Sequence, residues 1–219
     1  MIKQINCNKK NYLDNLTKFL DVRRSSKKPE NKIISKILSD IKKNKNKALI
    51  KYEKKFSKNS QIKPSIKEIN NAIKFLDPKI KKAIDFASKR IFNFHIKQKN
   101  KNILYKDSLN NKIEYKYVPI QSVGIYVPAN LPSTLLMNAI PAKIAGVKRI
   151  VLANPKNNGK LNPAVLYAAK KLGINEIYSM GGAQAIGSLA YIQKVNKIVG
   201  PGNIFVAGAK RQVFGDVGI

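Results

Sequence analysis

The chain has 219 residues, enough to bury the core of one large domain or of two modest ones. Hydrophobic residues make up 43% of it, which excludes a fully disordered chain. The single cysteine, Cys7, excludes an internal disulfide and fits a reducing compartment. The formal net charge of +31 suggests nucleic acid, an anionic membrane or an acidic partner.

The positive charge is spread along the chain rather than gathered in one segment. Residues 1–120 hold 32 basic and 10 acidic side chains, and residues 121–219 hold 11 and 2. Most of the excess is lysine among isoleucine and asparagine, and an A/T-biased genome would produce that mixture without a polyanionic partner. A nucleic-acid-binding surface should also carry arginine forks and exposed aromatics. Arginine is sparse and we expect most aromatics at core or strand positions, so nucleic-acid binding is kept as the alternative.

No segment predicts a membrane span or a signal peptide. The chain begins Met-Ile-Lys-Gln-Ile-Asn, without the apolar region of a signal peptide. Residues 117–142 carry no charge, but four prolines break this stretch into short elements. We therefore expect a soluble, cytoplasmic protein.

The first half of the chain is predicted to be mainly helical. Residues 30–60 should form two helices. Their buried stripe is predicted to consist of Ile33, Ile34, Ile37, Leu38 and Ile41, followed by Leu49, Tyr52 and Phe56.

Two helix starts follow, each marked by a capping signal. Ser65 and Glu68 form a capping box, and Asp77 precedes Pro78 as an N-cap. The predicted buried faces of these helices are Ile66, Ile69, Ile73 and Leu76, and then Ile80, Ala83, Ile84, Ala87, Ile91 and Phe94. Residues 103–105 and 113–117 alternate as strands of a hairpin around a turn at 109–111.

All twelve glycines lie after residue 120, and from there strands alternate with helices. This alternation predicts right-handed crossovers and a parallel sheet. We expect an α/β protein in which a Rossmann-like domain over 119–219 follows an N-terminal helical region with a β-hairpin over 1–118. The predicted strands are 123–127, 149–153, 176–179 and 197–199, and the predicted helices are 133–145, 162–172, 182–190 and 203–214.

Ligands of open parallel sheets bind beyond the carboxyl ends of the strands. Three strand ends here have suitable loops, at 126–130, 181–184 and 200–203. None matches the G-x-G-x-x-G dinucleotide fingerprint, and no P-loop occurs. From the residues alone, each loop could equally be a helix-start turn, with Gln184 and Asn203 capping backbone groups.

Five blocks in this half of the chain resemble histidinol dehydrogenase. They occur in the order expected of that family, and the likeness is strongest over 119–219. Residues 22–24 and 48–56 are similar to the family's N-terminal region more weakly. The five blocks are 122–128, 136–147, 181–186, 195–203 and 209–213.

The resemblance implies a zinc-containing homodimer that oxidises L-histidinol to L-histidine in two successive hydride transfers to NAD. It also implies that Tyr126, Gln184 and Asn203 contact NAD. The loop after Tyr126 departs from the family, because Ala129-Asn130 replaces a common Gly-Gly pair, and the segment between 190 and 195 is short.

The family's catalytic and zinc-binding residues match positions downstream of Ile219. We therefore assign no catalytic or metal residue here and expect no histidinol oxidation by the isolated chain. His95, the only histidine, has no carboxylate or cysteine nearby in sequence, so it predicts neither a zinc site nor a catalytic triad. Besides nucleic-acid binding, a non-catalytic remnant is the second alternative.

Overall fold

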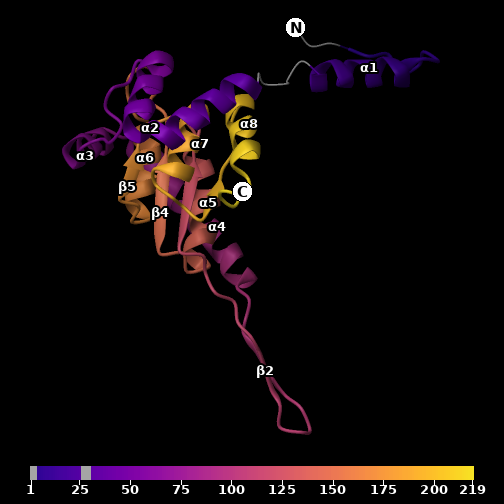
Figure 1. The fold of residues 1–219 in the computed structure, drawn as a ribbon, viewed down its shortest axis with the longest axis vertical. Helices are drawn as coiled ribbons and strands as arrows, with labels where there is room; N and C mark the ends of the chain where they lie inside the picture. The colour runs from indigo at the N-terminus through magenta and orange to yellow at the C-terminus, as the bar shows by residue number, and fades with distance from the viewer. Residues whose placement is uncertain (1–3, 26–30) are drawn as a thin grey trace.

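The computed structural model describes residues 4–25 and 31–219 (Figure 1). Residue 30, where the first long helix was predicted to begin, lies outside these ranges. The helices are α1 (Tyr12–Ser25), α2 (Asn31–Ser57), α3 (Ile66–Lys74), α4 (Pro78–His95), α5 (Pro132–Ile144), α6 (Pro163–Lys171), α7 (Gly182–Tyr191), α8 (Ile204–Val213) and the short 3-10 helix η1 (Ile96–Gln98). The strands are β1 (Ile103–Lys106), β2 (Lys112–Tyr115), β3 (Ser122–Tyr126), β4 (Arg149–Ala153), β5 (Glu176–Tyr178) and β6 (Lys197–Val199).

The predicted parallel sheet is confirmed. Its four strands lie in the order β5-β4-β3-β6, and every neighbouring pair is parallel. All five residues of β3 are buried, as expected for a strand in the interior of a parallel sheet. After α8 the chain returns to the edge of β6, where Ile198 N donates to the Gly218 carbonyl at 2.8 Å.

Helices cover both faces of the sheet. The core on one face is formed with α2, α7 and α8, and the core on the other with α3, α4, α5 and α6. The chain steps from β3 to β4 to β5 in one direction and then returns to place β6 on the other side of β3. The helices after β3 and β6 therefore lie on opposite faces, which makes the gap between these two strands the topological switch point.

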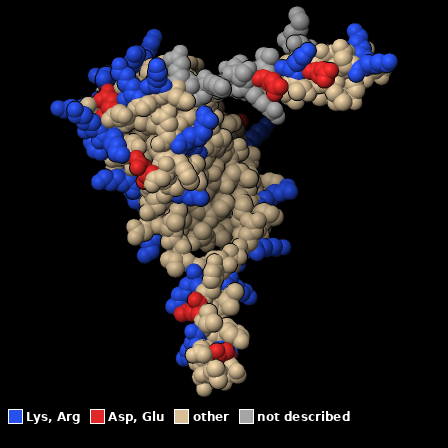
Figure 2. Space-filling model, turned by 45° about the vertical axis from the view of Figure 1, so that its right-hand side comes forward, with Lys and Arg blue, Asp and Glu red and all other residues tan. Residues whose placement is uncertain are grey.

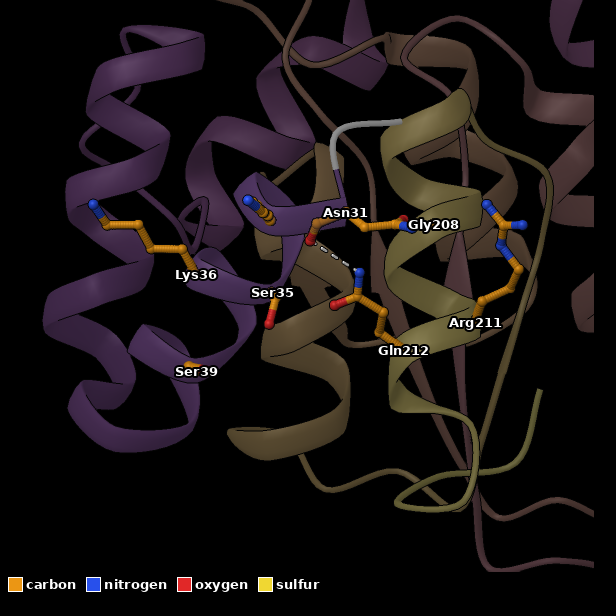
Figure 3. Close-up of a pocket in the computed structure, with 8 residues that line it drawn as sticks. Asn31, Ser35, Lys36, Ser39, Gly208, Arg211 and Gln212 are labelled. Atoms are coloured by element: carbon orange, nitrogen blue, oxygen red, sulfur yellow. Dashed lines mark hydrogen bonds between the residues drawn. The ribbon is translucent and has the colours of Figure 1, made fainter. Parts of the chain in front are cut away.

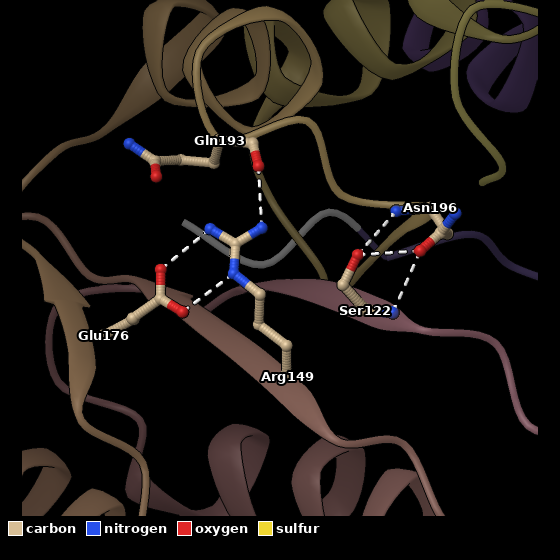
Figure 4. Close-up of polar contacts among 5 residues, drawn as sticks. All are labelled: Ser122, Arg149, Glu176, Gln193 and Asn196. Atoms are coloured by element: carbon tan, nitrogen blue, oxygen red, sulfur yellow. Dashed lines mark hydrogen bonds and ion pairs between the residues drawn. The ribbon is translucent and has the colours of Figure 1, made fainter.

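The amino ends of the strands are joined by polar side chains that satisfy one another (Figure 4). Arg149 binds both carboxylate oxygens of Glu176, at 2.7 and 2.8 Å, and donates to the Gln193 carbonyl at 2.7 Å. Ser122 and Asn196 exchange hydrogen bonds through backbone and side chain. These contacts tie β3, β4 and β5 to the connection between α7 and β6.

The β-hairpin forms as predicted but is not covered. β1 and β2 pair antiparallel and project from the body (Figure 1), and every residue of both strands is exposed. Asp107 organises the turn, because its Oδ1 accepts from the backbone N–H groups of Leu109 and Asn111. Asn110 takes the left-handed backbone conformation between them.

The predicted capping signals are confirmed. Ser65 Oγ accepts from Glu68 N at 3.1 Å, and the Glu68 side chain accepts from Ser65 N at 3.4 Å, completing the capping box. Asp77 is the N-cap of α4, which begins at Pro78, and its Oδ1 accepts from Lys79 N at 2.7 Å. The two predicted helices of residues 30–60 are the two parts of α2, which meet at a non-helical Lys45.

Several predictions of burial in these helices are wrong. Most of the α2 stripe is buried, but Ile33 and Phe56 are exposed, and so are Ile66, Ile80, Ala83 and Phe94. All of these except Ala83 lie in the first or last turn of a helix. The helical period gives the direction of a side chain but not the extent of the surface that it meets.

The expectation that most aromatic residues are in the core is also wrong. Seven phenylalanines are more than a third exposed, as are three tyrosines in and beside the hairpin. Within 4–25 and 31–219, no helix is both long and apolar enough to cross a membrane. The domain boundary at 118/119 stays a prediction, since first-half helices contribute to the cores on both faces of the sheet.

Candidate functional site

The switch point brings the loop after β6 against the end of β3. Gly200 has a φ of 102°, and a Cβ added there would lie 2.0 Å from the Tyr126 carbonyl oxygen. Only glycine allows this approach, because any larger residue would overlap the backbone of β3. The loop of residues 200–203 is therefore fixed beside Tyr126, at the place where doubly wound proteins bind ligands.

Tyr126 also connects β3 to the start of α7. The residue is 6% exposed, and its hydroxyl oxygen accepts from Gly182 N at 3.4 Å. Burial raises the pKa of the Tyr126 hydroxyl, with smaller effects from the Gly182 N–H, which lowers it, and from the charge of Glu53, which raises it. The phenol therefore stays protonated at neutral pH.

Gln184 lies in the first turn of α7 and is 3% exposed. Its Nε2 donates to Glu53 Oε1 at 2.9 Å, and the same oxygen accepts from Gly181 N at 2.8 Å. Within the described residues, the Gln184 Oε1 accepts no hydrogen bond. One end of this amide is therefore held by the protein, and the other end is not.

Asn203 is the N-cap of α8, one of the two roles that the sequence left open. Its Oδ1 accepts from Phe205 N and Val206 N, both at 3.1 Å, and the residue is exposed. The Asn203 Nδ2 has no hydrogen-bond partner in the part of the chain that the structure describes. Lys210 steadies the same loop, because its Nζ donates to the Gly200 carbonyl at 2.6 Å, and burial lowers its pKa.

Tyr126 lies beside the loops that carry the other two predicted site residues. Its hydroxyl accepts from Gly182, two residues before Gln184, and its backbone lies against Gly200, three residues before Asn203. Across the described ranges, no hydrogen bond links the Asn203 side chain directly to either of the other two.

The sequence analysis missed two polar residues at this edge. Glu53 follows Leu49 at helical spacing on the buried side of α2. A carboxylate on an apolar stripe was therefore the sequence signal that could have identified it. Asn154 comes directly after β4, and its Nδ2 donates to the carbonyls of Val127 and Pro128 at 3.0 and 3.2 Å. The Nδ2 contacts hold the loop after β3 in place. The Asn154 Oδ1, in contrast, is buried without a hydrogen-bond partner among the described residues.

The other polar features of the described residues do not form a binding site. Among the described residues, no group of three or more His, Cys, Asp or Glu is placed to hold a metal ion, so the residues described do not fit zinc. His95 ends α4 half-buried and pairs with Gln98, and Cys7 is exposed. A polar groove between α2 and α8 includes Lys36 and Arg211, which point away from one another (Figure 3), so it forms no converging anion site.

A parallel sheet covered by helices on both faces, with glycine loops at its switch point, defines a doubly wound α/β protein. A family model for histidinol dehydrogenase matches residues 21–219, and the chain belongs to that family.

The relatives agree with this assignment. The chain is 57% identical over its whole length to the histidinol dehydrogenase of Pelagibacter ubique, of which it covers 53%. It is 42% identical to that of Rhodospirillum rubrum, with 90% of the chain covering 48% of the relative. The crystal structure of histidinol dehydrogenase from Elizabethkingia anophelis superposes with a TM-score of 0.82 at 38% identity, over 88% of this chain and 47% of that one. The chain spans about half the length of these relatives.

Proposed function

We propose that this chain supplies the NAD platform of a histidinol dehydrogenase, the enzyme that oxidises L-histidinol to L-histidine in two hydride transfers. The observation that carries the proposal is the close contact of Gly200 with Tyr126 at the switch point, which holds the loop after β6 against the end of β3. NAD supplies the hydride acceptor of the reaction. This chain's own contribution is to bind and orient it.

The site residues supply complementary polar atoms to such a cofactor. Gln184 offers a free amide oxygen and Asn203 a free amide N–H, and the Tyr126 hydroxyl lies beside Gly182 at the start of α7. A dinucleotide presents ribose hydroxyls and a carboxamide, which hydrogen-bond to such groups. NAD therefore fits the donors and acceptors left open at this edge.

Binding of NAD can be measured by isothermal titration calorimetry. Asn203→Asp keeps the cap, because aspartate caps as well as asparagine, but it removes the amide N–H and adds a negative charge near the cofactor phosphates. We expect binding to weaken by about fivefold or more, the value of one lost hydrogen bond with added repulsion. Asn71→Asp on α3 adds the same charge away from the site and should leave affinity unchanged. Absence of any NAD binding by the parent chain would contradict the proposal.

The chemistry of the whole enzyme needs residues that we do not assign within this chain. No catalytic residue is proposed here, and zinc binding, homodimer formation and a cytoplasmic location stay predictions for the whole protein. We expect no NADH production when the isolated chain is mixed with L-histidinol and NAD. A rate above the protein-free control would contradict that expectation.

Nucleic-acid binding is the second candidate, and the exposed aromatics favour it. On α4 the Arg90 guanidinium lies 5.5 Å from the centre of the Phe86 ring, and near the end of α3 Lys74 Nζ lies 6.0 Å from that of Phe75. Such pairs can stack on bases. Figure 2, however, shows the basic side chains dispersed around a broad uncharged face rather than gathered in one stripe. This candidate predicts oligonucleotide binding that weakens steeply with salt, and absence of binding at low salt would dismiss it.

A non-catalytic remnant is the remaining candidate. The uncovered hairpin exposes Leu104, Leu109 and Ile113, which is unfavourable for an isolated chain. If the chain is an unstable remnant, circular dichroism should show no cooperative melt. A cooperative melt together with NAD binding would favour the platform.

A further inference from the structure

Glu53 is the only acidic side chain that is buried among those the structure describes. It is 1% exposed, on α2, in a protein whose other described carboxylates reach solvent. A carboxylate is rarely buried unless its oxygens are paired, because removal from water is costly. Its position therefore needs an explanation beyond packing.

Two N–H donors at the start of α7, one from its N-cap and one from its first turn, converge on one oxygen of Glu53. Gly181 N lies 2.8 Å and Gln184 Nε2 2.9 Å from Oε1, across separations of 128 and 131 residues in sequence. Burial raises the pKa of the Glu53 carboxyl, while the hydrogen bonds from Gly181, Gln184 and Ser57 lower it. The positive end of the α7 dipole also favours the charged form. Glu53 thus joins the layer of α2 to the start of α7.

This arrangement decides which end of the Gln184 amide faces outward. A carboxylate oxygen can only accept, so it holds the NH₂ end of the amide, and the carbonyl Oε1 must point the other way. A ligand group that meets this oxygen has to be a hydrogen-bond donor, such as a ribose hydroxyl or a carboxamide N–H.

The same contacts limit where phosphate can bind. Gly181 N–H is taken by Glu53, and Gly182 N–H is directed at the Tyr126 hydroxyl. Helix starts bind phosphate through free N–H groups. Two N–H groups at this helix start are therefore occupied, which leaves fewer donors for a pyrophosphate there.

We propose that Glu53 is a positioning residue that orients the Gln184 amide, so that the site selects a hydrogen-bond donor of the cofactor at the start of α7. The inference rests on the proposed function, because the cofactor is taken to be NAD. Glu53 does not touch the cofactor itself and acts through Gln184.

Calorimetric titration of the full chain with NAD tests this role through two substitutions. In Glu53→Gln the new carbonyl oxygen can accept the same two N–H groups, so affinity should stay within about threefold of the parent. Glu53→Met fills the space without an acceptor, frees the Gln184 amide and leaves Gly181 N–H unpaired. Affinity per folded molecule should then fall by about tenfold or more. Glu68→Met, the same change at an exposed capping residue, should leave affinity unchanged.

A double-mutant cycle separates positioning from general destabilisation. If Glu53 acts through Gln184, then Glu53→Met should have almost no further effect on NAD affinity in a Gln184→Met background. A purely structural role predicts that the two losses add. Additive losses would overturn the proposal.

Each outcome decides between the two claims. No NAD binding by the parent chain overturns both the cofactor assignment and the role of Glu53. Parent-like affinity in Glu53→Met, or a large loss in Glu53→Gln, overturns only the role of Glu53. If Glu53→Met does not melt cooperatively, Glu53→Asp decides instead. Its carboxylate is shorter by one carbon and should lose the bond to Gln184, so affinity should fall by about fivefold, and unchanged affinity would overturn the proposal.

Discussion

The two ends of the parallel sheet are built differently. At the amino ends, Arg149 and Glu176 use their charged groups on one another, and Ser122 and Asn196 exchange hydrogen bonds. At the carboxyl ends, polar atoms are left without partners among the described residues, including the Asn154 Oδ1 and the Gln184 Oε1. One end is closed by its own contacts, and the other is the end at which we propose that NAD binds.

Because of this difference, we expect substitutions at the two ends of the sheet to affect different properties of the protein. Changes at the amino ends should lower the free energy of unfolding and leave NAD affinity unchanged. Changes at the carboxyl ends should alter NAD affinity even where the fold tolerates them. A substitution that violated this division would weaken the assignment of the site.

The largest effect is expected at Gly200. Alanine there would place a Cβ 2.0 Å from the Tyr126 carbonyl oxygen and strain a backbone at φ 102°. We expect a loss of roughly 3 kcal/mol or more in the free energy of unfolding, because overpacking adds to the conformational strain. Gly159→Ala is the matched control, since φ there is 76° but nothing lies within 4 Å of the added Cβ. It should cost only about 1 kcal/mol. Similar urea-unfolding losses in both variants would show that the contact with β3 is unimportant.

A smaller effect is expected at the amino ends. Glu176→Gln replaces the bidentate partner of Arg149 with a neutral amide, and both side chains are about one-third exposed. Solvent screening limits the expected loss to about 1 kcal/mol in the free energy of unfolding. NAD affinity should not change. A loss of affinity in this variant would contradict the separation of the two ends.

The smallest effect is the pH dependence of that pair. The hydrogen bonds from Arg149 lower the pKa of Glu176 below its ordinary value of 4.5, while burial opposes the shift. A lowered pKa in the folded state means that this stabilisation is present above pH 4.5 and is lost as pH falls through the folded value. The difference in unfolding free energy between the parent and Glu176→Gln should therefore shrink in acid. A difference that stayed constant from pH 7 to pH 3 would contradict the role of the ion pair.

Much of the second half of the chain could be predicted from its sequence. The strands predicted at 149–153 and 197–199 have those bounds as β4 and β6. The strand predicted at 176–179 extends one residue beyond β5, and the strand predicted at 123–127 is shifted by one residue from β3. Buried parallel strands are short apolar runs between turn residues, and both signals are local. Burial was harder to predict. The exposure of Phe94, for example, depends on how far the neighbouring elements extend along α4, which no local pattern specifies.

The candidate site was predicted only in part for the same reason. Tyr126 and the loop before Asn203 follow from the rule that ligands bind beyond strand ends, since that rule needs only the strand positions. The contact of Glu53 with Gln184 spans 131 residues, and no local pattern specifies it. The strain-free approach of Gly200 to β3 likewise depends on the order of the strands.

The central claim is that NAD binds at the carboxyl edge between β3 and β6. Backbone amide shifts in ¹⁵N NMR spectra, recorded with and without NAD, test it most directly. The account predicts shifts concentrated at 126–131, 181–186 and 200–206, with little change around Arg149 and Glu176. Shifts gathered at the amino ends or along the hairpin, or no shifts at all, would contradict it.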